Sequence, residues 1–175
     1  MRLTRTAAAV LLATTFLAGC GGDDSDDPSV VSPEAGVSGQ VGQVLIRDLF
    51  VLGGDAEQLP AGGSAPVYMT LINRPAGGEP DPTAGTAAAE ADVLESVSSP
   101  AAESAEILNG PVRLPPGQDV RIGPDARIIL RDLTAPLSSD QEIKITLNFQ
   151  KAGSTTLSVP VVERDDGYQT YSPAP

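Results

Sequence analysis

Apolar and polar residues alternate along much of this chain, and the alternation predicts short β-strands. Residues 142–150 are apolar at every second position, and residues 153–162 continue the same pattern. Between them, Lys151-Ala152-Gly153 predicts the turn of a β-hairpin. Apolar, β-branched runs that stop at turn residues predict further strands over residues 44–52, 66–73, 92–98, 105–108, 112–114, 118–122 and 126–133.

The chain that follows the N-terminal segment shows no sustained helical periodicity. Residues 84–97 come closest, because they hold several alanines with good helix propensity. The insertion 76–91 is rich in Gly, Pro and Ala and lacks large apolar side chains, so it predicts a mobile loop. Eight or nine strands with one aliphatic core predict an all-β fold, an antiparallel β-sandwich.

The only cysteine, Cys20, follows Leu17-Ala18-Gly19 at the end of an apolar N-terminal stretch. This motif resembles the bacterial lipobox, in which the chain is cut before a cysteine that carries a diacylglyceryl group. The apolar run 7–17 is too short to span a bilayer, which needs roughly 20 residues, so a removed signal peptide over 1–19 is predicted. Lipid on Cys20, with an added N-acyl group such as palmitate, would anchor the protein on the extracytoplasmic face of the cell membrane. The alternative is a buried N-terminal helix with a free core cysteine.

Residue composition and strand pattern divide the remainder of the chain into a tether, one domain and a tail. Residues 20–42 begin with the lipidated cysteine and an acidic run, and they are interpreted as a flexible tether rather than a calcium loop, which needs spaced ligands. Residues 43–163 form the predicted β-sandwich domain. The tail 164–175 is interpreted as disordered, with a short recognition segment around Tyr168 and Tyr171 as the alternative.

Charge and composition exclude several classes of function. The net charge is −12 and becomes about −14 once Arg2 and Arg5 are removed with the signal, which argues against binding to nucleic acid or anionic lipid. There is no histidine, and acylation of Cys20 leaves no free thiol. Histidine-based catalytic triads, cysteine nucleophiles, disulfides and thiolate metal sites are therefore excluded.

Catalysis by other groups finds little support, and we expect that the protein is not an enzyme and needs no cofactor. Lys144 lies on the polar face of its predicted strand and Lys151 lies in a turn, so neither suits a Ser-Lys pair. Paired carboxylates could in principle act on glycosides, but Asp48, Asp132 and Glu142 are expected at strand ends or beside turns, where solvated carboxylates are common.

The order of strand signatures between residues 44 and 162 resembles the periplasmic copper chaperone family PCu(A)C. The matching segments are 46–48, 68–73, 97–102, 112–117, 145–153 and 159–161. The resemblance implies a cupredoxin-like sandwich. These segments are strands and turns, so they specify a scaffold rather than a reaction.

The chain departs from that family where the family binds Cu(I) with histidine and methionine. The resemblance places the family's first histidine at about Leu108 and its later His-x-Met pair at Arg127 and Ile129. Leucine and isoleucine offer no lone pair, and a guanidinium would repel a cation. Met69 is interpreted as core packing rather than as a copper ligand. The chain therefore looks like a lipid-anchored, actinobacterial-type member that has no metal site.

Arg127 and Arg131 alternate with Ile128 and Leu130, which places both guanidinium groups on one sheet face. They are interpreted as a solvated pair beside carboxylates such as Asp48 or Asp132. The alternative is a contact with a small anion or a partner where the copper site was lost.

Two hypotheses for the function follow. The first is a non-enzymatic binding or scaffold lipoprotein of the cell envelope, with a copper chaperone-like domain that binds no copper directly and with an unidentified protein partner. Its interaction surface would be the former metal end or the loop 76–91. The alternative is a copper metallochaperone, or an accessory factor in copper delivery, that uses non-standard ligands.

Overall fold

A computed structural model describes residues 36–54, 58–74, 90–125, 127–139, 141–164 and 166–172. The predicted signal peptide, Cys20 and most of both the tether and the loop 76–91 lie outside these residues. The described residues belong to one compact unit, Val31–Pro175. Because this unit contains all the strands and both apolar clusters described below, it has its own core and can fold alone. In the described residues no helix is long and apolar enough to cross a membrane.

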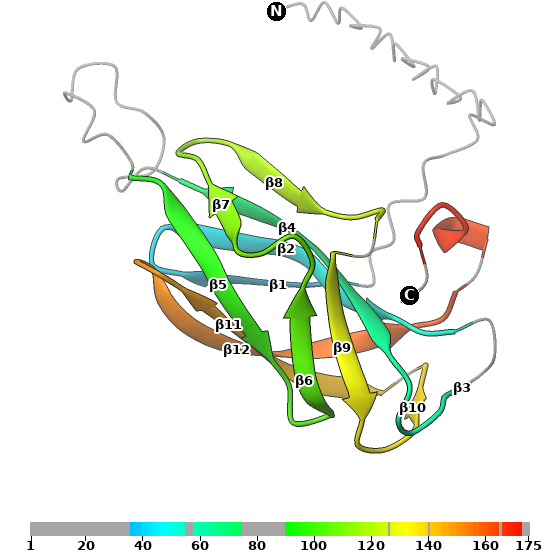
Figure 1. Cartoon of the computed structure of the whole chain (residues 1–175). Helices are drawn as coiled ribbons and strands as arrows, with labels where there is room; N and C mark the ends of the chain where they lie inside the picture. Colours follow the sequence, from blue (N-terminus) through cyan, green and yellow to red (C-terminus); the bar gives the residue numbers. More distant parts are fainter. Residues whose placement is uncertain are drawn as a thin grey trace, which may run out of the picture. The chain divides into compact units, whose positions relative to one another are not determined.

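The described part of the domain consists almost entirely of β-strands (Figure 1). The strands are β1 (Val37–Val41), β2 (Val44–Leu52), β3 (Gln58–Leu59), β4 (Ala65–Asn73), β5 (Asp92–Ser98), β6 (Ala102–Ile107), β7 (Val112–Leu114), β8 (Asp119–Ile122), β9 (Ile128–Leu133), β10 (Leu137–Ser138), β11 (Glu142–Phe149) and β12 (Gly153–Val162). One turn of 3₁₀-helix, η1 (Asp166–Tyr168), follows β12.

Ten of these strands form one mixed sheet, which corrects the predicted antiparallel sandwich of eight or nine strands. The sheet runs in the order β6-β9-β4-β2-β12-β11-β5-β7, with β1 beside β2 and β8 beside β4. The pair β12–β2 is parallel and joins the two halves of the sheet. The sheet curls around its core and nearly closes into a barrel-like shape, ending at β6 and β7 (Figure 1).

The core follows from the alternation along the strands. Apolar side chains from every main strand meet inside the sheet, and in β4 these are Val67, Met69 and Leu71. Met69 is buried in this cluster, as the sequence predicts for a packing residue. The intervening side chains of β4 face outward, and Tyr68 among them enters a second, smaller cluster on the outer face.

The predicted hairpin is confirmed: β11 and β12 pair without a break from Glu142 with Pro160 to Phe149 with Gly153. Three short strands were not predicted. β1 lies within the predicted tether and pairs with β2, and its Val37 and Val41 pack against the core. β3 and β10 pair only with each other over two residues each, so neither is long enough to show an alternating pattern.

The C-terminal residues 166–172 differ from the predicted disordered tail. They form η1 and a turn, and Tyr168 is buried against Phe50 of β2. Ser172 N–H donates to the Pro124 carbonyl oxygen (2.9 Å), which ties the segment to the loop between β8 and β9. The tail folds because its two tyrosines find apolar partners on the outer face of the sheet, which a local pattern does not reveal.

Candidate functional site

The positions that the family resemblance assigns to copper ligands lie together on the outer face, across β9 and the end of β6. Ile107 pairs with Ile128, and Leu108 N–H donates to the Arg127 carbonyl oxygen (2.7 Å), so positions 108 and 127 are direct neighbours. Ile129, two residues further along β9, is fully buried. The fold therefore keeps the three positions adjacent, while their side chains carry no soft donor atom.

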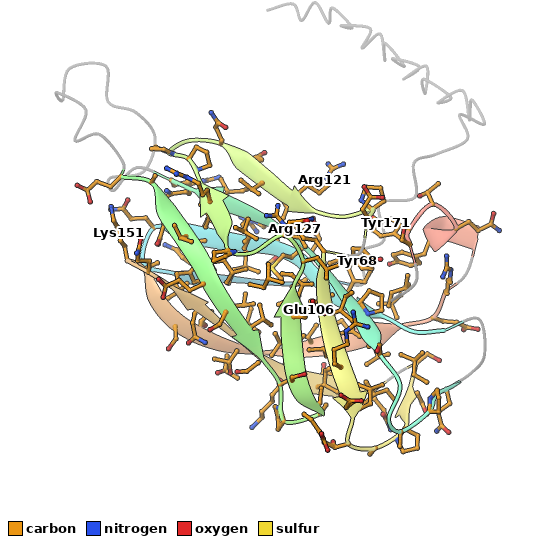
Figure 2. All side chains as sticks on the ribbon, in the orientation of Figure 1. Tyr68, Glu106, Arg121, Arg127, Lys151 and Tyr171 are labelled. Carbon is orange, nitrogen blue, oxygen red and sulfur yellow. The ribbon has the colours of Figure 1, made fainter. Side chains whose placement is uncertain are left out.

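Strand register extends this outer face into a continuous surface. Phe50 of β2 pairs with Tyr68 of β4, and Val67 pairs with Ile128. The pairing of β4 with β9 ends at Val67 and Ile128, and beyond it a Cβ on Gly123 would lie 2.8 Å from the Tyr68 ring. The outer face therefore carries two neighbouring groups, Phe50 with Tyr68 on β2 and β4, and Arg127 with Leu108. In Figure 2, the labels of Arg127, Tyr68 and Tyr171 lie in the same part of the domain, close to the C-terminal segment.

Arg131 follows on the same face and forms an ion pair. Its Nε and Nη2 both donate to Glu106 Oε2, at 3.2 and 3.0 Å. The sequence predicted a carboxylate partner for this arginine, but it named Asp48 or Asp132. Glu106 is the partner because β6 lies beside β9, with Ser104 opposite Arg131. Both side chains of the pair are partly exposed, so the pair contributes at most about 1 kcal/mol.

Arg127 is different, because the structure gives its guanidinium group no hydrogen-bond or ion-pair partner among the described residues. Its Nε atom is nevertheless buried. Buried polar atoms are almost always hydrogen-bonded in proteins, so an unpaired arginine nitrogen on this face is a notable exception.

An aromatic cluster of Phe50, Tyr68, Tyr168 and Tyr171 forms the other half of the site. Phe50 contacts the three tyrosine rings at centroid distances of 5.4, 5.1 and 5.9 Å, and Tyr68 meets Tyr171 edge-on at 4.8 Å. The Tyr68 hydroxyl donates to the Ser172 carbonyl oxygen, and Arg164 Nη2 donates to the Tyr171 carbonyl oxygen (2.7 Å). The C-terminal segment therefore covers the aromatic side chains of the sheet.

Burial in this cluster raises the pKa of Tyr68 to about 12, and the positive charge of Arg164 opposes the rise. The neighbouring Tyr171 and Asp125 add smaller contributions in the same direction as burial. The Tyr68 phenol therefore stays neutral over the whole physiological range, and it serves as a hydrogen-bond donor rather than as an acid or a base.

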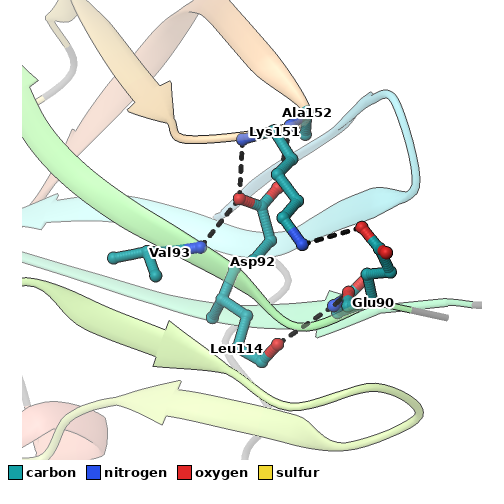
Figure 3. Close-up of polar contacts among 7 residues, drawn as sticks. Glu90, Asp92, Val93, Leu114, Lys151 and Ala152 are labelled. Carbon is teal, nitrogen blue, oxygen red and sulfur yellow. Dashed lines mark hydrogen bonds and ion pairs between the residues drawn. The ribbon is translucent and has the colours of Figure 1, made fainter.

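A second polar region surrounds Asp92 at the start of β5 (Figure 3). The buried Asp92 carboxylate accepts the backbone N–H groups of Val93, Lys151 and Ala152, at 2.7, 2.9 and 2.8 Å. Lys151 Nζ also forms an ion pair with the exposed Glu90 carboxylate (2.8 Å), and its hydrogen bond and charge lower the pKa of that carboxyl. These contacts fasten the β11–β12 hairpin to β5.

The hollow at this second region has a volume of about 370 Å³. The side chains of Asp92, Lys151, Glu90 and Asn73 in its lining are already engaged: Asn73 Nδ2 donates to the carbonyl oxygens of Glu90 and Leu114, at 2.9 and 3.0 Å. In Figure 2, Lys151 lies at the other end of the domain from Tyr171. Because its polar groups serve the fold, we place the candidate site on the outer face around Arg127.

Three carboxylates were candidates for catalysis, and no contact in the described structure brings them together: Asp48, Asp132 and Glu142. Asp48 and Asp132 lie inside β2 and β9 rather than at strand ends, both exposed and both with a positive φ, 52° and 54°. Asp48 lies where the register of β2 shifts against its neighbours, which marks a β-bulge. Glu142 is exposed at the start of β11. Among the described residues, no three His, Cys, Asp or Glu side chains gather around a common point.

Comparison with known proteins agrees with this fold. A family model described as "Putative lipoprotein LpqE-like" matches residues 44–161, more than half of the chain. The chain belongs to the LpqE-like lipoprotein family. A relative from Leifsonia xyli subsp. xyli (strain CTCB07), "Putative lipoprotein Lxx21020", is 29% identical over 87 residues. That match covers 49% of this chain and about half, 52%, of the relative.

Solved structures of copper chaperone domains share the fold of this LpqE-like chain. The copper-bound PCuAC domain from PmoF2 has a TM-score of 0.57 and 22% identity, over 73% of this chain and 98% of that domain. The apo PCuAC domain from PmoF1 has a TM-score of 0.58 and 21% identity, over 73% and 99%. The resemblance to the PCu(A)C family is therefore confirmed at the level of the fold.

Several residues of this outer face were not singled out by sequence analysis. Glu106, Phe50 and Tyr68 lie within predicted strands, and the sequence alone does not distinguish them from ordinary strand residues. The signal that could have found the aromatic ones is the scarcity of aromatic residues. The chain has three Phe and three Tyr, and four of these six gather here.

Proposed function

We propose that this LpqE-like protein is an extracytoplasmic lipoprotein, anchored through lipid on Cys20, whose domain binds a partner or ligand without catalysis and without holding copper. The anchor rests on the lipobox-like sequence Leu17-Ala18-Gly19-Cys20 and on membership of a lipoprotein family. The non-enzymatic role rests on the absence of histidine and of any thiol besides Cys20 in the sequence.

The observation that carries the proposal is the identity of the side chains at the three adjacent positions. Leu108 and Ile129 offer only carbon atoms, and Arg127 is a permanent cation. Met69, the one methionine in the described residues, packs into the core with 2% exposure, so its thioether is not presented to solvent. Cu(I) prefers thiolate, thioether and imidazole ligands, and this face provides none of them.

The test is a competition titration of residues 31–175 with Cu(I) and a chromogenic chelator under anaerobic conditions. A copper chaperone should bind with a dissociation constant of about 1 μM or tighter. We expect no competition with the chelator. A clear one-to-one competition would contradict the proposal and would support the alternative, a metallochaperone with non-standard ligands, with Met69 as the first residue to substitute.

A gain-of-ligand variant makes the same test sharper. The triple substitution Leu108→His, Arg127→His and Ile129→Met restores the family's ligand types at the three adjacent positions. Because the backbone already holds these positions together, we expect the variant to compete for Cu(I) where the natural chain does not. The double variant that keeps Ile129 is the matched control, and its circular dichroism and that of the triple variant should match the natural chain.

A further inference from the structure

The unpaired guanidinium group of Arg127 is the feature of the outer face that the fold leaves unexplained. Its Nε is buried and has no hydrogen-bond partner in the part of the chain that the structure describes, while the side chain as a whole is partly exposed. A buried donor that is left unsatisfied costs about 1–3 kcal/mol, and more for a charged group. A charged donor that reaches solvent only in part is therefore suited to an acceptor that comes from outside the chain.

The neighbours of Arg127 explain why it lacks an internal partner. Glu106 lies opposite Ile129, so it has Arg131 on one side and Arg127 on the other along the face. Its Oε2 accepts both hydrogen bonds from Arg131. Directly beside Arg127 stands Leu108, which has no polar atom in its side chain. The carboxylate of Glu106 is thus engaged by Arg131, and the described residues form no ion pair with Arg127.

The ion pair of Arg131 shows which kind of group satisfies the donors of an arginine on this face, namely a carboxylate. Arg131 donates from Nε and Nη2 to the same oxygen, Glu106 Oε2, so a carboxylate satisfies both donors on that side of the guanidinium. Arg127 has the same two donors, and its Nε has no hydrogen-bond partner among the described residues. A carboxylate or a phosphate presents oxygens that match this fork.

Resting on the proposed binding function, we propose that Arg127 is the centre of a binding site for a small oxyanion, a carboxylate or a phosphate group. The anion arrives at the part of the side chain that faces solvent, and a rotation about the last side-chain bonds turns Nε toward it. Leu108, whose N–H donates to the Arg127 carbonyl oxygen, forms one side of the site. The buried surface of Ile129 lies beside it.

The experiment follows the side-chain Nε–H resonance of Arg127 by NMR in residues 31–175. Sodium phosphate and sodium acetate are titrated separately at constant ionic strength, so that the two arms distinguish a phosphate from a carboxylate. We expect saturable shifts at Arg127 Nε–H and at the Leu108 amide, with a dissociation constant on the order of 1–10 mM for the preferred anion. Saturation with either anion supports the site.

Two variants separate a specific site from general attraction to arginines. Arg127→Gln should weaken binding at least tenfold, about the effect of one charge-assisted hydrogen bond. Arg121→Gln, which removes an exposed arginine of β8, should leave the affinity unchanged. Equal loss in both variants, or no saturation by either anion, would overturn the proposal.

A third variant keeps Arg127 and supplies a carboxylate from the chain itself. Leu108→Glu places a carboxylate directly beside Arg127, so we expect it to abolish the anion response. Leu108→Gln, of the same size without the charge, should retain the response. An unchanged response in Leu108→Glu would also overturn the proposal, and this test stands even if Arg127→Gln fails to fold. None of these results depends on the copper titration, so the two proposals can fail separately.

Discussion

Tyr68 illustrates how one side chain joins the sheet to the C-terminal segment. Its ring packs between Phe50 and Tyr171, and its hydroxyl donates to the Ser172 carbonyl oxygen. A Cβ on Gly123 would approach the Tyr68 ring to 2.8 Å, so the loop before β9 must pass close to the ring at a residue without a side chain. The burial that raises the Tyr68 pKa is thus produced by three separate parts of the chain.

The raised Tyr68 pKa makes part of the stability depend on pH. The folded protein keeps the phenol neutral up to about pH 12, whereas in the unfolded chain it ionises near pH 10. The stability that the neutral Tyr68 phenol contributes is therefore complete below pH 10, and it is lost as the pH rises from 10 toward 12.

Tyr68→Phe tests this dependence by urea unfolding at pH 7, 10 and 11. The variant should lose about 1 kcal/mol at pH 7, since the hydrogen bond to Ser172 is removed. The difference in the free energy of unfolding between the natural chain and the variant should become smaller at pH 11, because only the natural chain carries this phenol. A difference in the free energy of unfolding that stays constant with pH would contradict the role of the Tyr68 phenol in this pH dependence.

At the scale of elements, buried polar contacts between strands hold parts of the sheet in place. Asp92 is the clearest case, because its carboxylate joins the first residues of β5 to the turn between β11 and β12. Its side chain is 3% exposed, so its hydrogen bonds have little competition from water. The turn that the sequence predicts at Lys151-Ala152-Gly153 is thus fixed by a residue about sixty positions earlier.

Asp92→Asn replaces one of the accepting oxygens with an amide that can only donate. At least one of the three backbone N–H groups then loses its acceptor, so we expect the free energy of unfolding to fall by about 1–3 kcal/mol. Asp119→Asn, at an exposed position of β8, is the control and should change it by less than about 0.5 kcal/mol. Thermal and urea unfolding of both variants provide the measurement. Equal stability of the two variants would show that Asp92 does not hold the hairpin.

On the scale of the whole molecule, the domain presents its candidate site on the outer face of a mixed sheet. The C-terminal segment lies on this face, and the strand β1, in the last part of the predicted tether, lies beside β2. In the proposed arrangement the tether leads from the lipid on Cys20 to β1. The strongly acidic chain would then be held at the membrane by its lipid rather than by attraction to anionic headgroups.

The anchor is tested by Cys20→Ala in the full chain. Without the thiol no diacylglyceryl group can be attached, so the variant should move from the membrane fraction to the soluble or secreted fraction. Ser25→Ala, in the same acidic segment, is the control and should stay with the membrane. Fractionation followed by detergent phase separation gives the measurement. A Cys20→Ala chain that stays with the membrane would contradict the proposed lipid anchor on Cys20.

Local pattern was enough to predict most of the strands and the hairpin. Alternation, β-branched residues and turn residues are short-range signals, so β2, β5, β7 and β12 begin and end where the sequence predicts. The same holds for Met69 as a core residue. The positions of Leu108, Arg127 and Ile129 were found through the family resemblance, and the residue types there were enough to predict that copper ligands are missing.

Tertiary structure alone decided how these strands are joined and what meets on the outer face. The parallel pair β2–β12, the ion pair of Arg131 with Glu106 and the docking of Tyr168 all connect residues far apart in the chain. No local periodicity encodes such partners, because an alternating strand shows which residues face outward but not what covers them. For the same reason, only the pairing of β9 with β6 reveals that Arg127 lies beside Leu108, and that its Nε has no hydrogen-bond partner among the described residues.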